Sequence, residues 1–114
     1  MATQRWITEM GMGVDVHGND HTKAARRAVS DALRHSSLSF FAAARKERDD
    51  MRVDVIVGVP EPDAVDVVAV AEEVPYGTVS VRAELGGLAV PAAPGADVIV
   101  IANAAILVGF DSDA

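Results

Sequence analysis

The spacing of apolar residues changes across a short polar turn, His17-Gly18-Asn19-Asp20, and this change limits what the chain can fold into. Before the turn, polarity alternates over residues 5–16, which predicts a strand with one apolar face. That face consists of Trp6, Thr8, Met10, Met12, Val14 and Val16. After the turn, residues 21–36 have helical spacing, which predicts an amphipathic helix with Asp20 or Asn19 as its N-cap. Its apolar stripe consists of Ala25, Ala28, Val29, Ala32 and Leu33.

The rest of the chain repeats this pattern of strands and helices. Strands are predicted over 52–59, 78–85 and 97–102, and 104–110 continues the last one after a bend at Asn103. Asp63 is the predicted cap of a second helix through Val74, and residues 88–90 are a candidate short partner strand. Residues 38–44 fit either a longer first helix or a loop, and 45–50 fit a solvated connector. The order β-α-β-α-β-β predicts one α/β (α+β) domain over residues 1–114, with two helices on one face of a single sheet.

The composition predicts a soluble protein that associates with itself. Of the 114 residues, 50% are hydrophobic but only 4% are aromatic, so the apolar content is mostly aliphatic. A domain of this size keeps a high ratio of surface to volume, and other subunits would cover the remaining apolar surface. We therefore expect a homo-oligomer in which the free face of the sheet is covered by other copies.

Charge and motifs argue against several classes of partner. The net charge of −7 makes binding to nucleic acid or to an anionic membrane unfavourable. The apolar run 98–110 is too short to span a bilayer, and residues 1–10 do not have the pattern of a signal peptide, so we expect a cytoplasmic protein. The glycines match neither a dinucleotide fingerprint nor a phosphate-binding loop, and no cofactor is predicted. With no cysteine, thiolate chemistry is excluded.

The segment from Gly11 to Lys23 carries most of the polar groups that an aliphatic scaffold does not need. Asp15 and His17 would share one strand face and are the candidates for proton transfer. Lys23 and the helix N-terminus would hold an anionic or carbonyl group. Glycine weakens a strand unless a backbone or a ligand approaches closely. The predicted ligand-binding residues are Gly13, Gly18, Asn19, Asp20, His21, Lys23 and Asn103.

Other interpretations of these residues remain open. Asp15, His17, Asp20 and His21 are a possible metal site, but their spacing matches no strong template, and His21 has the simpler interpretation of facing solvent. Arg26, Arg27 and Arg34 fit a solvated face with an Arg27–Asp31 pair, or else an anion site at a subunit interface. His35 and Ser36 suggest a nucleophile, although a histidine near a helix C-terminus has an ordinary electrostatic role. Asn103 interrupts an apolar run and, if buried, must be hydrogen-bonded, so it would either orient a ligand or fix a subunit contact.

The runs GMGVDVHGNDHTKAARRAV, GVPEPDAVDV and VIVIANAA resemble a family of short uncharacterised bacterial proteins over nearly the whole chain. More distantly, the step Asn19-Asp20-His21-Thr22-Lys23 resembles the helix-opening motif of the ring-opening amidohydrolases, cyanuric acid hydrolase and barbiturase. Those enzymes join three similar domains around a three-fold axis in the Toblerone fold, and Lys23 stands where they have a substrate-binding arginine. The resemblance implies a homotrimer with polar pockets between subunits.

Two departures separate the chain from those enzymes. Met12 or Gly11 stands near the position of their lysine, and Gly58 or Val59 near that of their serine, so the Ser–Lys machinery is missing. Three functional hypotheses follow. The chain is an enzyme, such as a hydrolase or isomerase of a small polar, nitrogen-containing compound; a non-catalytic domain that binds a metabolite; or a structural trimer without a ligand.

Overall fold

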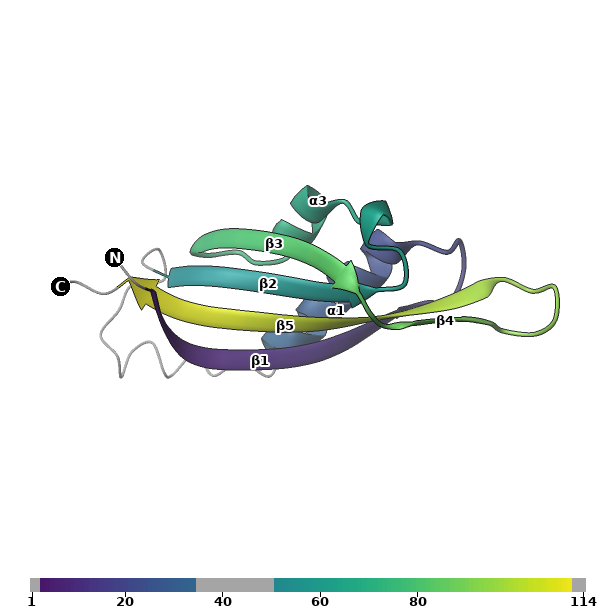
Figure 1. Cartoon of the computed structure of the whole chain (residues 1–114), viewed down its shortest axis with the longest axis horizontal. Helices are drawn as coiled ribbons and strands as arrows, with labels where there is room; N and C mark the ends of the chain where they lie inside the picture. The colour runs from purple at the N-terminus through teal and green to yellow at the C-terminus, as the bar shows by residue number, and fades with distance from the viewer. Residues whose placement is uncertain (1–2, 35–50, 112–114) are drawn as a thin grey trace.

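A computed structural model describes residues 3–34 and 51–111, with side chains described for 7–34 and 51–110. The predicted α+β architecture is confirmed, with one strand more than the predicted order because residues 88–91 also pair (Figure 1). The elements are β1 (Thr3–Asp15), α1 (His21–Arg34), β2 (Met51–Val59), the 3-10 turn η2 (Pro62–Ala64), α3 (Val67–Ala71), β3 (Thr78–Leu85), β4 (Leu88–Pro91) and β5 (Val98–Asp111). No helix in these described ranges is long and apolar enough to cross a membrane.

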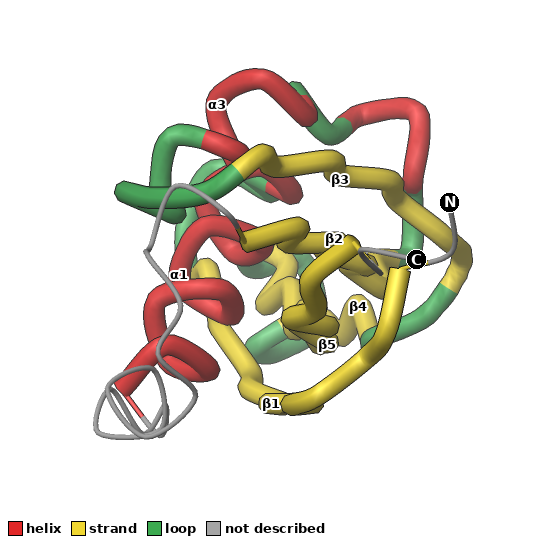
Figure 2. Tube along the Cα trace, turned by 90° about the vertical axis from the view of Figure 1, so that its left-hand side faces the viewer, coloured by secondary structure: helices red, strands yellow, loops and turns green. Residues whose placement is uncertain are grey.

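All five strands form one mixed sheet in the order β1-β5-β2-β3, and β4 pairs with the first part of β5. Only the β2–β3 pair, which is connected through α3, is parallel. The central place of β5 agrees with its apolar residues on both faces. The expected bend at Asn103 is wrong, because the register with β1 and β2 continues through this residue. Both helices lie on the same face of the sheet (Figure 2).

Small aliphatic side chains fill the core between α1 and the sheet. The predicted stripe of α1 is buried except for Leu33, which is half-buried. Val53, Val55, Val57 and Val59 of β2 point toward α1, as the alternation predicts, and β5 adds Val100, Ala102, Ala104 and Ile106. With side chains this short, the backbone of α1 can come close to the sheet.

The core-facing side of β1 is the opposite of the one its pattern suggests. Gly11, Gly13 and Asp15 face α1, whereas Met10 and Met12 are 66% and 54% exposed on the other side. A Cβ atom at Gly13 would collide with the backbone of Ala24 and Ala28. The strand presents glycines to α1 because the helix backbone occupies the space that side chains would need.

The second helix differs most from prediction. Asp66, not Asp63, is its N-cap and accepts hydrogen bonds from the backbone N–H groups of Val68 and Ala69. The Oγ1 of Thr22 accepts the backbone N–H of Asp66 at 2.8 Å, which fixes this point of the chain against α1. α3 therefore begins late and has only five residues. The interpretations that concern residues 35–50 lie outside the described residues.

Gly13→Ala should lower the free energy of unfolding by about 2–3 kcal/mol, because the new methyl group has to displace backbone rather than a flexible side chain. Gly58→Ala in β2 is the matched control, since its Cβ would make only ordinary contacts from 3.4 Å outward, and we expect a change of about 1 kcal/mol or less. Urea denaturation measures both. Equal stability of the two variants would contradict the close approach of α1 to β1.

Candidate functional site

The turn between β1 and α1 reverses the chain through two residues with left-handed backbone. Gly18 has φ +88° and Asn19 has φ +52°, a conformation that glycine and asparagine adopt at lower cost than other residues. Asp20 then caps α1, as predicted, by accepting the backbone N–H of Lys23 on its Oδ1 at 2.9 Å. The turn thus brings the end of β1 beside the first turn of α1.

Asp15 connects this turn to the helix from inside the protein. Its side chain is 1% exposed, and its Oδ2 accepts the backbone N–H of Asp20 at 3.0 Å. Its Oδ1 lies 3.5 Å from the Nζ of Lys23 and has no hydrogen-bond partner among the described residues. A buried carboxylate with a spare acceptor beside a half-exposed lysine is unusual in an aliphatic core.

Burial of the Asp15 carboxyl raises its pKa, but the backbone N–H of Asp20 and the charges of Lys23 and Arg27 lower it by more. The pKa therefore lies below its ordinary value of 3.8. Asp15 is therefore a carboxylate at neutral pH. A carboxylate with a depressed pKa is a weak base, so the geometry favours a structural and electrostatic role for Asp15 over proton abstraction.

The structure does not bring His17 into contact with Asp15. β1 ends at Asp15, and the side chain of His17 is 81% exposed in the turn. Its Nδ1 lies 3.0 Å from the Oδ2 of Asp97, which precedes β5. Asp97 was not predicted because it is 80 residues away in the sequence, and the pairing of β1 with β5 brings the two side chains together.

His21 is 2% exposed, so the interpretation that it faces solvent is wrong. Its Nδ1 lies 3.1 Å from the carbonyl oxygen of Asn19, an acceptor, which places a hydrogen on Nδ1. Nε2 lies 3.5 Å from a carboxylate oxygen of Glu61, just after β2, and has no hydrogen-bond partner in the described part of the chain. Glu61 was also missed, and its place directly after a buried strand was the only signal.

A groove of about 460 Å³ runs along the outer side of α1. It is lined by Asp20, Thr22, Lys23, Arg26, Arg27, Ser30 and Glu73. Three of these residues are cationic, and the Nε of Arg26 donates to Glu73 at 2.7 Å. Arg34 lies outside this groove and lines a neighbouring hollow of about 340 Å³ instead.

Arg27 and Asp31 bond the edge of β1, a role that sequence analysis did not predict. Arg27 Nη1 donates to the carbonyl oxygen of Val14 at 2.6 Å, and Asp31 Oδ2 accepts the backbone N–H of Met12 at 3.0 Å. Both backbone groups point away from β5, since β1 is the outer strand of the sheet. Two side chains of α1 therefore satisfy part of an open strand edge.

Asn103 is placed away from the groove. It is exposed on the sheet face opposite the helices, where it pairs in register with Met12 and Gly58. Asn103 is therefore not a buried group that requires a hydrogen bond within the chain. Gly13 serves the packing of α1, and Gly18 and Asn19 form the turn. The groove and its margin bring together Asp15, Asp20 and Lys23 from the predicted set.

Metal binding by the histidines and acids of the turn lacks a suitable geometry. Within 7–34 and 51–110, no three His, Cys, Asp or Glu side chains are grouped so that they could hold a metal ion. His17 and His21 instead have separate acidic neighbours, Asp97 and Glu61. The alternative of a four-residue metal site is not supported by the arrangement of these side chains.

Comparison with known proteins gives a family and a close structural neighbour. The model of the conserved hypothetical protein family Lin0512 matches residues 5–108. The crystal structure of an FtsZ-like protein of unknown function from Nostoc punctiforme is similar with a TM-score of 0.87 and 37% sequence identity. That similarity covers 98% of this chain and 99% of the other. No curated protein matches the sequence.

Asp15→Asn should cost about 2 kcal/mol of unfolding free energy at neutral pH, because it replaces a buried charged acceptor with a neutral amide and removes the negative charge beside Lys23. The lowered pKa means that the carboxylate stabilises the fold fully above its ordinary value of 3.8, and that this contribution is lost as the pH falls through the folded-state pKa. The difference between wild type and variant should therefore shrink under acid. Urea denaturation from neutral pH to below 3.8 tests this, with the exposed Asp63→Asn as control. A difference that stays constant would contradict it.

Proposed function

The chain belongs to the Lin0512 family of conserved hypothetical proteins, and we propose that it is a homo-oligomeric domain that binds a small anionic molecule along α1. The observation that carries the proposal is the groove with Lys23, Arg26 and Arg27 on its walls. The lining also holds the carboxylates of Asp20 and Glu73, and Glu73 is paired with Arg26, so three positive and two negative groups leave a net charge of +1 at the groove. In a chain with a net charge of −7, this local excess of positive charge favours a negatively charged ligand.

The wall of the groove is compatible with a carboxylate or phosphate group. Arginine can bind either group through two parallel N–H donors, and lysine adds a point charge. The hydroxyl of Ser30 adds a neutral donor on the same wall. A volume of about 460 Å³ lies in the range of small-molecule sites. The buried carboxylate of Asp15 holds Lys23 at one end of the groove and so limits where its ammonium group can lie.

Isothermal titration calorimetry with pyrophosphate, citrate and malonate tests this site. We expect at least one of these anions to bind, and the double variant Lys23→Gln/Arg26→Gln to weaken that binding at least tenfold, because each lost charge-assisted bond is worth about 1.5–3 kcal/mol. Arg34→Gln is the matched control, since it removes a charge from the same helix outside the groove. Equal binding by the double variant and the control would refute the proposal.

Acid–base catalysis is the second candidate function, and it is favoured by the His17–Asp97 pair. Asp97 lies 3.0 Å from the Nδ1 of His17, an arrangement that orients the imidazole and leaves Nε2 for proton transfer. Hydrolysis of a small polar amide is what the resemblance to the ring-opening amidohydrolases implies. In this version of the proposal, His17 acts as the base and Asp15 contributes through Lys23.

His17→Ala separates catalysis from binding. The pair is exposed on both sides, so its removal should change unfolding free energy by no more than about 1 kcal/mol. If the chain is a hydrolase, the variant loses turnover of cyclic amides and imides in a product assay while its calorimetric binding of anions is kept. Turnover that persists in His17→Ala would exclude this residue as the base.

Self-association belongs to the same proposal. Half of the residues are hydrophobic, and the helices cover only one face of the sheet. A homotrimer is the assembly that the resemblance to the Toblerone fold implies. A purely structural trimer is the remaining alternative, and it would form without binding any of the anions above.

A further inference from the structure

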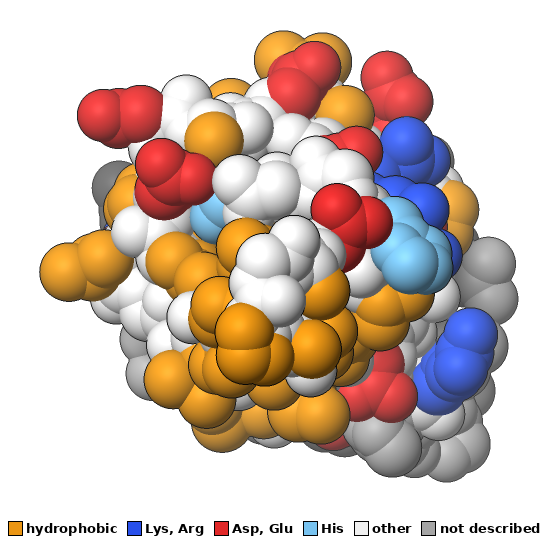
Figure 3. All heavy atoms as spheres, turned by 90° about the vertical axis from the view of Figure 1, so that its right-hand side faces the viewer, with side chains coloured by type: hydrophobic (Ala, Val, Ile, Leu, Met, Phe, Trp, Pro, Cys, Tyr) orange, Lys and Arg blue, Asp and Glu red, His pale blue; other side chains and the backbone are white. Residues whose placement is uncertain are grey.

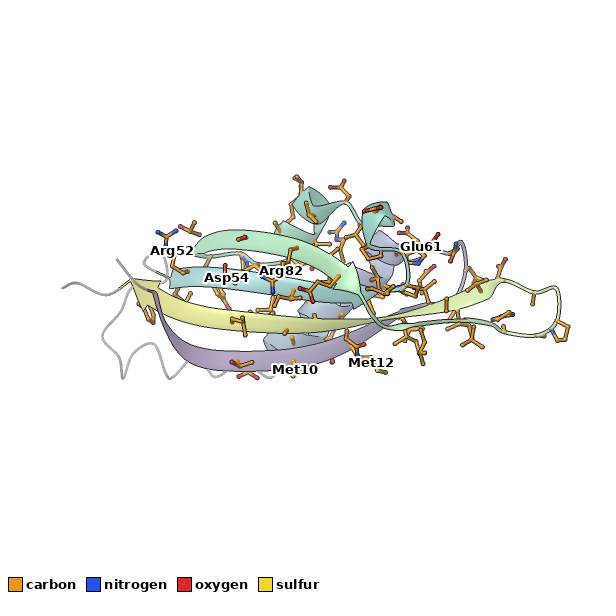
Figure 4. All side chains as sticks on the ribbon, viewed as in Figure 1. Met10, Met12, Arg52, Asp54, Glu61 and Arg82 are labelled. Carbon is orange, nitrogen blue, oxygen red and sulfur yellow. The ribbon has the colours of Figure 1, made fainter. Side chains whose placement is uncertain are left out.

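The sheet face away from the helices, called here the open face, carries apolar side chains that the described chain leaves uncovered (Figure 4). Met10 and Met12 of β1 are 66% and 54% exposed, and Leu88 and Val90 of β4 are 60% and 50% exposed. Half-buried Ile56, Ile101 and Leu107 lie on the same face. Apolar side chains gather around the β4–β5 end of the molecule (Figure 3).

Strand register groups these apolar side chains into two rows, one on either side of the exposed Asn103. Met10 is level with Ala105 of β5, which is level with Ile56 of β2. Four residues further along β1, beyond the row of Met12 and Asn103, Val14 is level with Ile101, which is level with Leu88. A contiguous apolar patch on a small protein marks an interaction site, whereas scattered exposed residues do not.

The charged part of the open face is balanced, unlike the chain as a whole. Arg52 and Asp54 alternate along β2, and Arg82 and Glu84 alternate along β3, so the described side chains of this face include two positive and two negative groups. The Nε of Arg82 lies 2.9 Å from a carboxylate oxygen of Glu84. Two copies that meet by these described residues therefore face little of the repulsion that the net charge of −7 would otherwise produce.

We propose that a second copy of this chain packs on the open face, which gives the oligomeric part of the proposed function a defined surface. Because Arg82 is already paired with Glu84 and the described charges of the face cancel, a second copy that packs there meets no net charge. A strongly basic or acidic partner would gain nothing from a face whose charges cancel. The open face is apolar on β1, β4 and β5 and charge-balanced on β2 and β3, so the open faces of two copies are compatible with each other.

Two further features favour face-to-face packing. Arg27 and Asp31 already bond β1 at Val14 and Met12, so another strand cannot add to the sheet there. The β4–β5 ribbon, residues 88–101, projects beyond the helix layer (Figure 1). A two-stranded ribbon is marginally stable alone in water, and a second copy on the open face would cover Leu88 and Val90 of this ribbon.

Sedimentation velocity of the full chain from about 1 to 200 μM tests the proposal. Wild type should sediment as an oligomer, and Met10→Glu/Met12→Glu should sediment as a monomer at the same concentration. Val68→Glu is the matched control, since Val68 is 69% exposed on α3, away from the open face, and this variant should remain assembled. Circular dichroism shows whether each variant is folded.

If the double methionine variant does not fold, Arg82→Glu provides the test, because it makes the open face net negative without touching the core. Its dissociation constant should rise at least tenfold. A wild type that is monomeric over the whole concentration range, or unchanged assembly of the folded open-face variants, overturns the proposal. So does a monomeric wild type that co-sediments with phosphatidylcholine vesicles, because the open face would then bind a lipid surface instead of a second copy. Anion binding by a monomer would leave the ligand proposal standing, so the two proposals can fail separately.

Discussion

The backbone contact between α1 and β1 is the constraint on which the rest of the structure depends. Gly11 and Gly13 have no side chains, so the helix lies directly on the strand. At this distance Arg27 and Asp31 reach the outer edge of β1, and Lys23 reaches the carboxylate of Asp15. The same contact leaves the larger side chains of β1 on the opposite face. A tightly packed core and an uncovered apolar sheet face thus have one common cause.

Charge is distributed as unevenly as packing. An acidic chain places three cations and two carboxylates around one groove, and the described charges of the open face cancel. The buried Asp15 remains ionised because a backbone N–H and two cations compensate for its loss of water. Lys23 and Arg27, which offset the desolvation of the Asp15 carboxylate, also line the groove. A substitution of Asp15 would therefore affect both the core and the groove.

Sequence alone predicted what depends on local periodicity. The strands at 52–59 and 78–85, the buried stripe of α1 and the Asp20 cap follow from neighbours in the chain. Prediction from sequence failed where a contact between residues distant in the chain determines the local structure. Thr22 sets the start of α3 at Asp66, and glycines on β1 reverse which face is buried. The site was predicted in part for the same reason: Asp15, Asp20 and Lys23 are close in sequence, whereas Asp97 and Glu61 reach the turn only through the sheet.

The position of β5 has a consequence for how the chain folds. β1, β2 and β4 all pair with β5, and its contacts with β1 join residues about a hundred positions apart. Among the described strands, the parallel β2–β3 pair is the only pairing that does not involve it. Until this segment docks, the valines of β2 and the alanines of α1 have no complete surface to pack against. The chain must lose the entropy of closing a long loop before these contacts stabilise it, and this slows folding. We therefore expect the chain to fold slowly for its length, with the sheet and the helix layer forming together.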